Sequence, residues 1–132
     1  METIKEFFKN DTFAEYVGIE LLEVSKGRAK AKLEIKHEHL NGVNIVHGGA
    51  IYTLADLVFA VASNSHGNVA VAINGSIAYL KAVTEGTLFA EAEEVSINQK
   101  LATYKVSVTD ERDNTIAIFQ GMVYRKKDTL HG

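Results

Sequence analysis

Cysteine is absent from the 132-residue chain, so neither disulfide bonds nor thiolate chemistry can operate in it. A zinc site would have to use histidine and carboxylate ligands. Positive charge is also scarce, since 14 Lys and Arg side chains face 17 Asp and Glu side chains and the net charge is -3. Phosphate binding needs a clustered positive field, so this balance argues against nucleic acid as the main partner.

Long apolar runs are missing as well. No uninterrupted stretch approaches the roughly 18 residues that suggest a membrane span. The start, Met-Glu-Thr-Ile-Lys-Glu, carries charges where a signal peptide needs an apolar run. We therefore expect a cytoplasmic protein with no membrane partner. With 46% apolar and 23% charged residues, the composition is that of one ordinary globular domain.

Two patterns occupy the first quarter of the chain. Apolar residues at helical spacing in residues 2–16 predict short amphipathic helices, and Asp11 is suited to cap the second one. Residues 28–36 alternate strictly between apolar and charged side chains, which predicts a strand with one buried and one wet face. Residues 18–24, joined to it by Ser-Lys-Gly, are its expected hairpin partner.

The remaining chain is typical of a sheet that encloses one helix. Four further strands are expected, separated in part by turn residues at Glu85-Gly86 and Asp113-Asn114, over residues 69–80, 87–96, 102–110 and 115–125. Before them, residues 48–64 form an apolar run suited to a helix and leave almost no polar face, so we expect burial on all sides. One helix wrapped by an antiparallel sheet is an α+β fold, and a second subunit would have to help if one sheet cannot enclose the helix.

Asp56 is the only fully charged residue between Glu38 and Lys81, and it lies within this apolar helix. A buried, unpaired carboxylate is costly, so it is normally paired, hydrogen-bonded or functional. The structural alternative is that Asp56 caps nearby backbone or pairs with a cation from another segment. We favour the functional interpretation, a carboxylate in a partly desolvated cleft that serves as general base or nucleophile.

The helix opens with His47-Gly48-Gly49. Glycines at a helix start leave N–H groups approachable where the helix dipole favours negative charge, which are the conditions of an oxyanion hole. The same glycines could equally serve only to permit a tight entry into the helix. Asp56 lies roughly 12 Å beyond Gly48 along such a helix. One carbonyl cannot reach both, whereas antiparallel helices of two subunits would bring one Gly48 beside the other Asp56.

Two segments before this helix contain histidine, and the first of them has the appearance of a metal motif. His37-Glu38-His39 lacks the spacing of a zincin helix, and we interpret it as the solvated end of a strand, with no metal site. His47 is either a satisfied core histidine or, as its glycine neighbours favour, a residue of the site.

Three short motifs, taken in order, resemble the hotdog-fold thioesterases, specifically the phenylacetate-degradation (PaaI-like) group: Asn41-Gly42, His47-Gly48-Gly49 and Leu54-Ala55-Asp56. Residues 76–81 and the later Gly86-Thr87-Leu88 and Ala90-Glu91-Ala92 are similar to the family's central strand and the strand that follows it. The resemblance extends over residues 18–124. Two departures stand out: Ala70-Val71-Ala72 has no hydroxyl where some members carry Ser or Thr, and Ala82 stands where Pro is frequent.

The resemblance implies one hotdog domain over residues 1–132, with a five- or six-stranded antiparallel sheet wrapped on the long helix. Residues 1–17 would form an N-terminal helical segment, residues 18–126 the hotdog core and residues 127–132 a tail. The resemblance also implies hydrolysis of coenzyme A thioesters, with no metal or organic cofactor. The protein would assemble into homodimers that pair further into dimers of dimers. Aryl and medium-chain acyl groups remain equally open.

By position, the resemblance implies that Asp56 is the nucleophile or the base that activates water. The Gly48 N–H would polarise the thioester carbonyl from the opposite subunit, while Asn41 and His47 orient water or substrate. Further substrate contacts are expected from Gly49, Tyr52, Phe59 and Lys81, with Lys81 a candidate to meet the coenzyme A phosphates.

Two other functions are compatible with the same fold. Hydration or dehydration of enoyl and hydroxyacyl thioesters would use a histidine paired with an acid, for which His47 and Asp56 are the candidates. Non-catalytic binding of acyl-CoA is the second. Only about 17 residues precede the sheet, too few for a helix-turn-helix, so such a sensor would need a separate partner.

Overall fold

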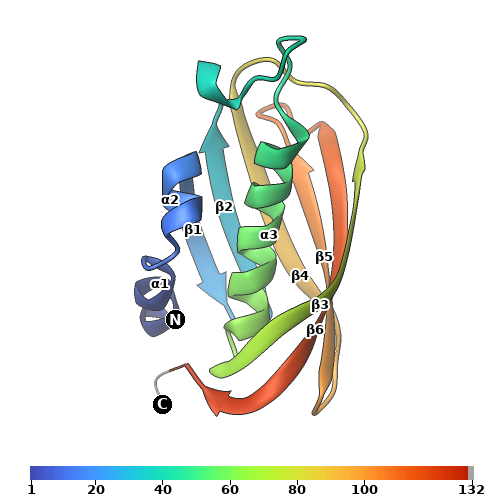
Figure 1. The fold of residues 1–132 in the computed structure, drawn as a ribbon. Coiled ribbons are helices and arrows are strands. Elements are labelled where there is room, and N and C mark those ends of the chain that lie inside the picture. The colour runs from blue at the N-terminus through green and yellow to red at the C-terminus, as the bar shows by residue number, and fades with distance from the viewer. Residues whose placement is uncertain (131–132) are drawn as a thin grey trace.

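The computed structural model describes residues 1–130, and its sheet has six antiparallel strands in the order β1-β2-β4-β5-β6-β3, wrapped around one long helix (Figure 1). In chain order the elements are α1 (Glu2–Phe8), α2 (Thr12–Val17), β1 (Ile19–Ser25), β2 (Arg28–Glu34), the 3-10 helix η1 (His37–His39), α3 (Gly48–Asn64), β3 (Asn68–Tyr79), β4 (Thr87–Ile97), β5 (Leu101–Thr109) and β6 (Thr115–Thr129). The expected α+β class and hotdog arrangement are confirmed.

The hairpin of β1 and β2 follows from the alternation in the sequence. Ala31 and Leu33 have no exposed surface, while Arg28 on the other face lies within 3.6 Å of Glu91 and within 3.5 Å of Glu93 on β4. Gly27 closes the turn with φ of 75°, a conformation that glycine adopts without steric cost. The β2 strand therefore has one apolar face against the core and one charged face toward solvent.

The N-terminal helices lie along the β1 side of the sheet (Figure 1). The predicted cap is confirmed, because Asp11 Oδ1 accepts the Ala14 N–H at 3.1 Å at the start of α2. At the other terminus the expected tail begins too early. The β6 strand continues to Thr129, which pairs with Asn68 of β3, so part of the predicted tail, residues 127–132, is strand, and residues 131–132 lie outside the described part of the chain.

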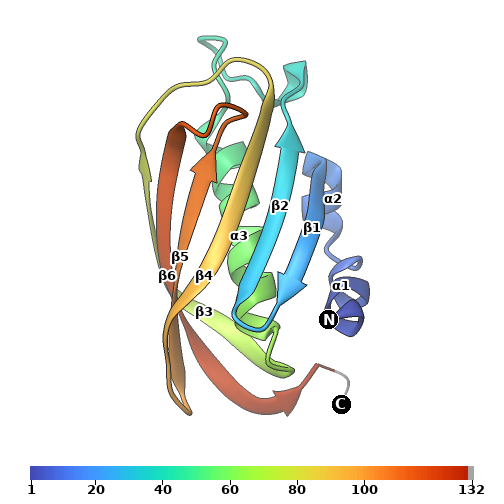
Figure 2. The ribbon, with the colours of Figure 1, turned by 180° about the vertical axis from the view of Figure 1, so that it is seen from behind.

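The central helix α3 packs one face on the concave side of the sheet, where Leu54, Val58 and Val61 are fully buried. The expectation of burial on all sides is wrong for the single chain, because Tyr52 and Asp56 on the opposite face are exposed. Figure 1 looks onto this uncovered face, and Figure 2 shows the sheet in front of the helix from the other side. The sheet covers only one side of α3, so the apolar composition of the helix exceeds what this chain alone can bury.

The β3 strand forms one edge of the sheet and pairs only with β6. It spans 12 residues, and its apolar side chains are largely open, with Val71 43% and Ile73 56% exposed. A long, apolar, unpaired edge is a liability that proteins normally cover or pair. The open face of α3 and the open edge of β3 are thus the two surfaces that remain uncovered in the monomer.

The segment His37-Glu38-His39 is not a solvated strand end. It forms η1, and His39 is only 6% exposed. Its Nδ1 accepts the Lys36 N–H at 2.9 Å, so the ring proton lies on Nε2 and is donated to the Val17 carbonyl at 2.6 Å. His39 therefore joins the end of α2 to the loop before α3. Within residues 1–130, none of the helices combines the length and hydropathy that crossing a membrane requires.

Candidate active site

The N-terminus of α3 presents one backbone donor that is free. His47 is the N-cap, and its Nδ1 accepts the Gly49 N–H at 2.8 Å. The N–H groups of the next two residues, Ala50 and Ile51, donate to the His47 carbonyl at 3.0 and 3.4 Å. Of the first four amides of the helix, only the Gly48 N–H has no hydrogen-bond partner among residues 1–130. The first turn thus leaves a single donor at the positive end of the helix dipole, where an oxyanion would be stabilised.

Tyr79, the last residue of β3, lies against this glycine. Its hydroxyl donates to the Gly48 carbonyl oxygen at 3.1 Å, and a Cβ added to Gly48 would stand 3.2 Å from Tyr79 Cζ. The sequence prediction of the site missed Tyr79. The available signal was its place within residues 76–81, one of the segments that carry the family resemblance, but the contact with Gly48 joins positions 31 residues apart.

Asn41 organises the loop that leads into α3. Its Oδ1 accepts the N–H groups of Val43 at 3.0 Å and Ile45 at 3.3 Å, and its own N–H donates to the Ile45 carbonyl at 2.8 Å. The side-chain oxygen is therefore occupied within the loop. Only the amide NH₂ of Asn41 remains for a substrate or water, so Asn41 can act there only as a donor.

Asp56 lies on the open face of α3, two turns beyond Gly48, and is exposed in the single chain rather than buried as expected. Partial burial nevertheless raises the pKa of its carboxyl, and the negative charge of Asp11 raises it further. No hydrogen bond or ion pair joins the carboxylate to any side chain or backbone group of the described residues, so neither structural role considered for it is present. An unpaired carboxylate of raised basicity is suited to general-base or nucleophilic work.

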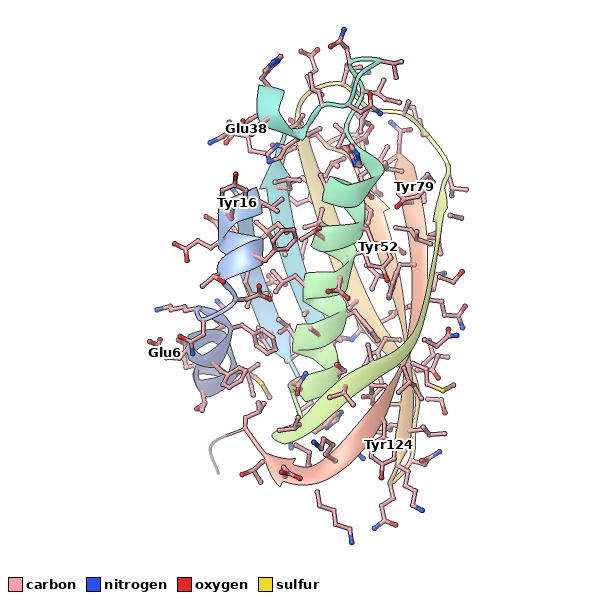
Figure 3. All side chains as sticks on the ribbon, in the orientation of Figure 1. Glu6, Tyr16, Glu38, Tyr52, Tyr79 and Tyr124 are labelled. Atoms are coloured by element: carbon pink, nitrogen blue, oxygen red, sulfur yellow. The ribbon has the colours of Figure 1, made fainter. Side chains whose placement is uncertain are left out.

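A cleft of about 770 Å³ lies over the N-terminal half of α3. Residues of four elements line it, and the expected site residues His47, Gly49 and Tyr52 are among them. Tyr16 and Glu38 approach the cleft from the side of α2 and η1, whereas Tyr79 does so from the β3 side (Figure 3). This volume lies in the range of small-molecule sites, and the wall is rich in aromatic rings.

Two expected substrate contacts are placed elsewhere. Phe59 is only 2% exposed and packs in the core, with its ring centroid 5.1 Å from that of Phe119 and 6.0 Å from that of Tyr104. On a helix with apolar residues all round, sequence could not tell which positions face the sheet. Lys81 is not among the residues lining the cleft. It lies near Asp110, whose pKa is lowered chiefly by a hydrogen bond from Asn114 and also by the positive charge of Lys81.

The hydratase alternative needs a proton relay between His47 and Asp56. The Nδ1 of His47 is engaged by the Gly49 N–H, and the described residues show no hydrogen bond between the His47 ring and the Asp56 carboxylate. Within residues 1–130, no three histidine or carboxylate side chains are grouped so that they could hold a metal ion. Of the expected catalytic residues, His47 lines the cleft, whereas Asn41, Gly48 and Asp56 are not among its lining residues.

Comparisons with known proteins identify the family of this chain. The family model described as the thioesterase superfamily matches residues 43–117. A relative from Archaeoglobus fulgidus is 47% identical over 127 residues, which cover 95% of this chain and 82% of the relative. The acyl-coenzyme A thioesterase PaaI of Escherichia coli is 32% identical over 126 residues, which cover 95% of this chain and 90% of that protein.

Solved structures give the same result. The structure of E. coli PaaI superposes with a TM-score of 0.91 at 30% identity, covering 95% of this chain and 91% of that one. A Streptococcus mutans protein bound to acetyl CoA superposes with a TM-score of 0.81 at 26% identity, covering 85% and 91% of the two chains. The chain therefore belongs to the hotdog-fold thioesterase superfamily, and its activity is hydrolysis of a thioester.

Proposed function

We propose that this protein hydrolyses coenzyme A thioesters of aryl or medium-chain acids, at a site shared between two subunits. The observation that carries the proposal is the free Gly48 N–H at the start of α3, on the same helix as the unpaired, basic Asp56. The coenzyme A part rests on the E. coli relative, which is named an acyl-coenzyme A thioesterase, and on the acetyl CoA bound to the S. mutans structure. The cytoplasmic location stays a prediction from the sequence.

In the proposed reaction the Gly48 N–H donates to the thioester carbonyl oxygen and stabilises the negative charge that develops there. Asp56 either removes a proton from the water that attacks the carbonyl carbon or attacks that carbon itself. Collapse of the tetrahedral intermediate restores the carbonyl and breaks the C–S bond. The coenzyme A thiolate leaves and takes up a proton. Where water is the attacking group, this step yields the free acid directly. Where Asp56 attacks, the acyl group remains on the carboxylate as an anhydride, which water then hydrolyses to the free acid and the regenerated Asp56 carboxylate.

The remaining expected residues position the reactants. His47 accepts the Gly49 N–H through Nδ1, so in this hydrogen bond the neutral ring carries its proton on Nε2, where it can donate to substrate or water. The NH₂ of Asn41 can orient the attacking water. Gly49 and Tyr52 line the cleft beside the acyl group. These contacts bring the reacting atoms together and do not themselves form or break bonds.

A second copy of the chain completes the site in this proposal. Gly48 and Asp56 lie roughly 12 Å apart along one helix, too far for a single carbonyl group to contact both. Antiparallel packing of two α3 helices through their open faces would place Gly48 of one copy beside Asp56 of the other. Pairing of the two exposed β3 edges would join the sheets in the same dimer. Such dimers would pair further into dimers of dimers.

The acyl pocket in this proposal is the aromatic wall of the cleft. Phe13 and Tyr16 of α2, which are 62% and 89% exposed, line it together with Tyr52 of α3. Aromatic rings pack equally well on an aryl group and on an alkyl chain, which supports both acyl classes. Very short acyl groups would leave this wall uncovered.

Thiol release from a panel of aryl-, short-, medium- and long-chain acyl-CoA esters tests the activity. We expect kcat/KM for the best aryl or medium-chain ester to exceed that for acetyl-CoA by about tenfold or more. The reason is that each additional methylene buried in an apolar pocket is worth about 1–3 kcal/mol. Absence of thiol release from every ester would refute the proposed function.

Mixing two inactive variants tests whether the site is shared. Asp56→Asn removes the base, and Gly48→Pro removes the N–H donor. If each site takes Gly48 from one subunit and Asp56 from the other, a mixed dimer holds one intact site and one doubly altered site. Co-refolded variants should then regain activity that neither variant shows alone. Activity that stays absent in the mixture, with mixed dimers demonstrated by differential tagging, would place both residues of a site in one subunit.

A further inference from the structure

One peptide unit at the start of α3 is held by side chains at both of its polar atoms. The carbonyl oxygen of Gly48 accepts the Tyr79 hydroxyl at 3.1 Å. The N–H of Gly49, on the other side of the same peptide bond, donates to His47 Nδ1 at 2.8 Å. His47 comes from the loop before the helix, whereas Tyr79 comes from the end of β3, so the two contacts reach the peptide from different elements.

We propose that Tyr79 is a positioning residue of the thioesterase reaction, which fixes the Gly48–Gly49 peptide and thereby the direction of the neighbouring Gly48 N–H. The inference rests on the proposed function and deepens it. Two consecutive glycines lack the side chains that restrict backbone rotation, so the helix start alone would leave this N–H loosely oriented. An oxyanion donor is effective only when it is already aimed at the oxygen on which charge develops. The contact from Tyr79 supplies the order that the glycines lack.

The close contact between the Tyr79 ring and the helix backbone explains why position 48 is a glycine and position 79 a tyrosine. The Tyr79 ring lies over Gly48, and a Cβ at Gly48 would approach Cζ to 3.2 Å, closer than most carbon contacts. A glycine therefore lets the phenol reach the helix backbone. Partial burial raises the pKa of Tyr79, and the nearby Tyr52 raises it further, so the phenol stays protonated and remains a donor. Donation to the Gly48 carbonyl also polarises the same peptide and strengthens the Gly49 N–H bond to His47.

Tyr79→Phe is the direct test, because it keeps the ring and removes only the hydroxyl. We expect kcat to fall about tenfold, with KM within about twofold of wild type, since a donor that acts in the transition state is disturbed and substrate contacts are kept. The acid limb of the pH–rate profile should not move, because Tyr79 exchanges no proton. Tyr124→Phe is the matched control: Tyr124 is a similarly exposed strand tyrosine on β6, and its hydroxyl has no hydrogen-bond partner among residues 1–130.

A double-mutant cycle separates positioning from a merely structural role. Because Tyr79 and His47 hold one peptide, Tyr79→Phe combined with His47→Ala should lose less kcat than the product of the two single losses. Tyr79→Phe should also lower the NMR order parameter of the Gly48 N–H without changing Tm by more than about 2 °C. A wild-type kcat in Tyr79→Phe, or a loss confined to KM, would overturn the inference. A wild-type protein that releases no thiol would instead refute the proposed function, and an unchanged Gly48 order parameter would then count against the role of Tyr79 as well.

Discussion

The hydroxyl of Tyr104 donates to Glu94 Oε1 at 2.6 Å, at the opposite end of the molecule from the proposed active site. His66, just beyond α3, contacts the same oxygen through Nε2 at 2.8 Å. Burial raises the pKa of Glu94, but the hydrogen bonds from Tyr104 and His66 outweigh it, and the net shift is downward. This small network joins the end of α3 to β4 and β5. We therefore expect it to contribute to the stability of the fold and not to catalysis.

Glu94→Gln should destabilise the fold at neutral pH by about 1–2 kcal/mol, because the amide keeps the shape but loses the charge-assisted hydrogen bonds. A carboxyl whose pKa is lower in the folded state stabilises the fold above its unfolded-state pKa and ceases to do so as the pH falls through the folded value. The difference between wild type and variant should therefore vanish in acid, which urea unfolding at several pH values would measure. Glu91→Gln, at an exposed ion pair with Arg28, should change stability by less than about 0.5 kcal/mol at any pH. An equal loss in both variants would contradict a special role for Glu94.

Gly48→Pro should lower kcat by about 10²–10³-fold, the usual cost of removing one oxyanion donor. Proline suits the first position of a helix, and the extended His47 backbone, with φ of -62° and ψ of 135°, suits a residue before proline. The fold should therefore survive, as circular dichroism would show. Gly48→Ala is the matched control, since it adds the same Cβ beside Tyr79 but keeps the N–H, and it should lose far less. If alanine proved as damaging as proline, crowding of Tyr79 and not the lost donor would be the cause.

Asp56→Asn should lower kcat by about two to four orders of magnitude, because the amide is neither a base nor a nucleophile. Binding of substrate should be retained, as Kd measured by calorimetry would show. Stability should stay equal or rise at neutral pH. A carboxyl whose pKa is raised on folding favours the folded state fully only below its unfolded-state pKa and loses that contribution as the pH rises. Full activity in this variant, or unfolding, would remove Asp56 from the mechanism.

Asp11→Asn should shift the acid limb of the kcat/KM profile to lower pH. The negative charge of Asp11 is the second cause of the raised Asp56 pKa, after burial, and the variant removes that charge. Asparagine caps a helix about as well as aspartate, so α2 and the overall stability should be preserved. The profile should be compared with that of Asp128→Asn, a change on the distant end of β6. An acid limb that stays in place would show that Asp11 does not act on the catalytic carboxyl.

Ile73→Lys should convert the protein into inactive monomers. Ile73 is 56% exposed on the open edge strand β3, and a lysine there would bury its charge in the proposed subunit contact. Sedimentation velocity at micromolar concentration would show the change in mass. Val95→Lys, at a 61% exposed position on the interior strand β4, should leave the dimer and its activity intact. A wild-type protein that is monomeric and active would contradict the shared site.

Much of this fold was determined by local patterns in the sequence. The helix over residues 48–64 was predicted to the residue, because a long apolar run with glycines at its start fits no strand. The alternation in β2 and the turns at Gly27, Gly86 and Asp113 were equally local, since side-chain periodicity and positive φ are properties of short segments. The place of Asp56 on the helix followed from the same counting.

Tertiary structure decided what local patterns could not. On α3 nearly every position is apolar, so periodicity did not distinguish Phe59, which faces the sheet, from Tyr52, which lines the cleft. His39 became a buried link to Val17 only when α2 packed beside the loop before α3. Tyr79 meets Gly48 because the chain returns along β3 beside the start of the helix. Such contacts join residues far apart in sequence, and their energies depend on the packed arrangement of the whole domain and not on any one segment.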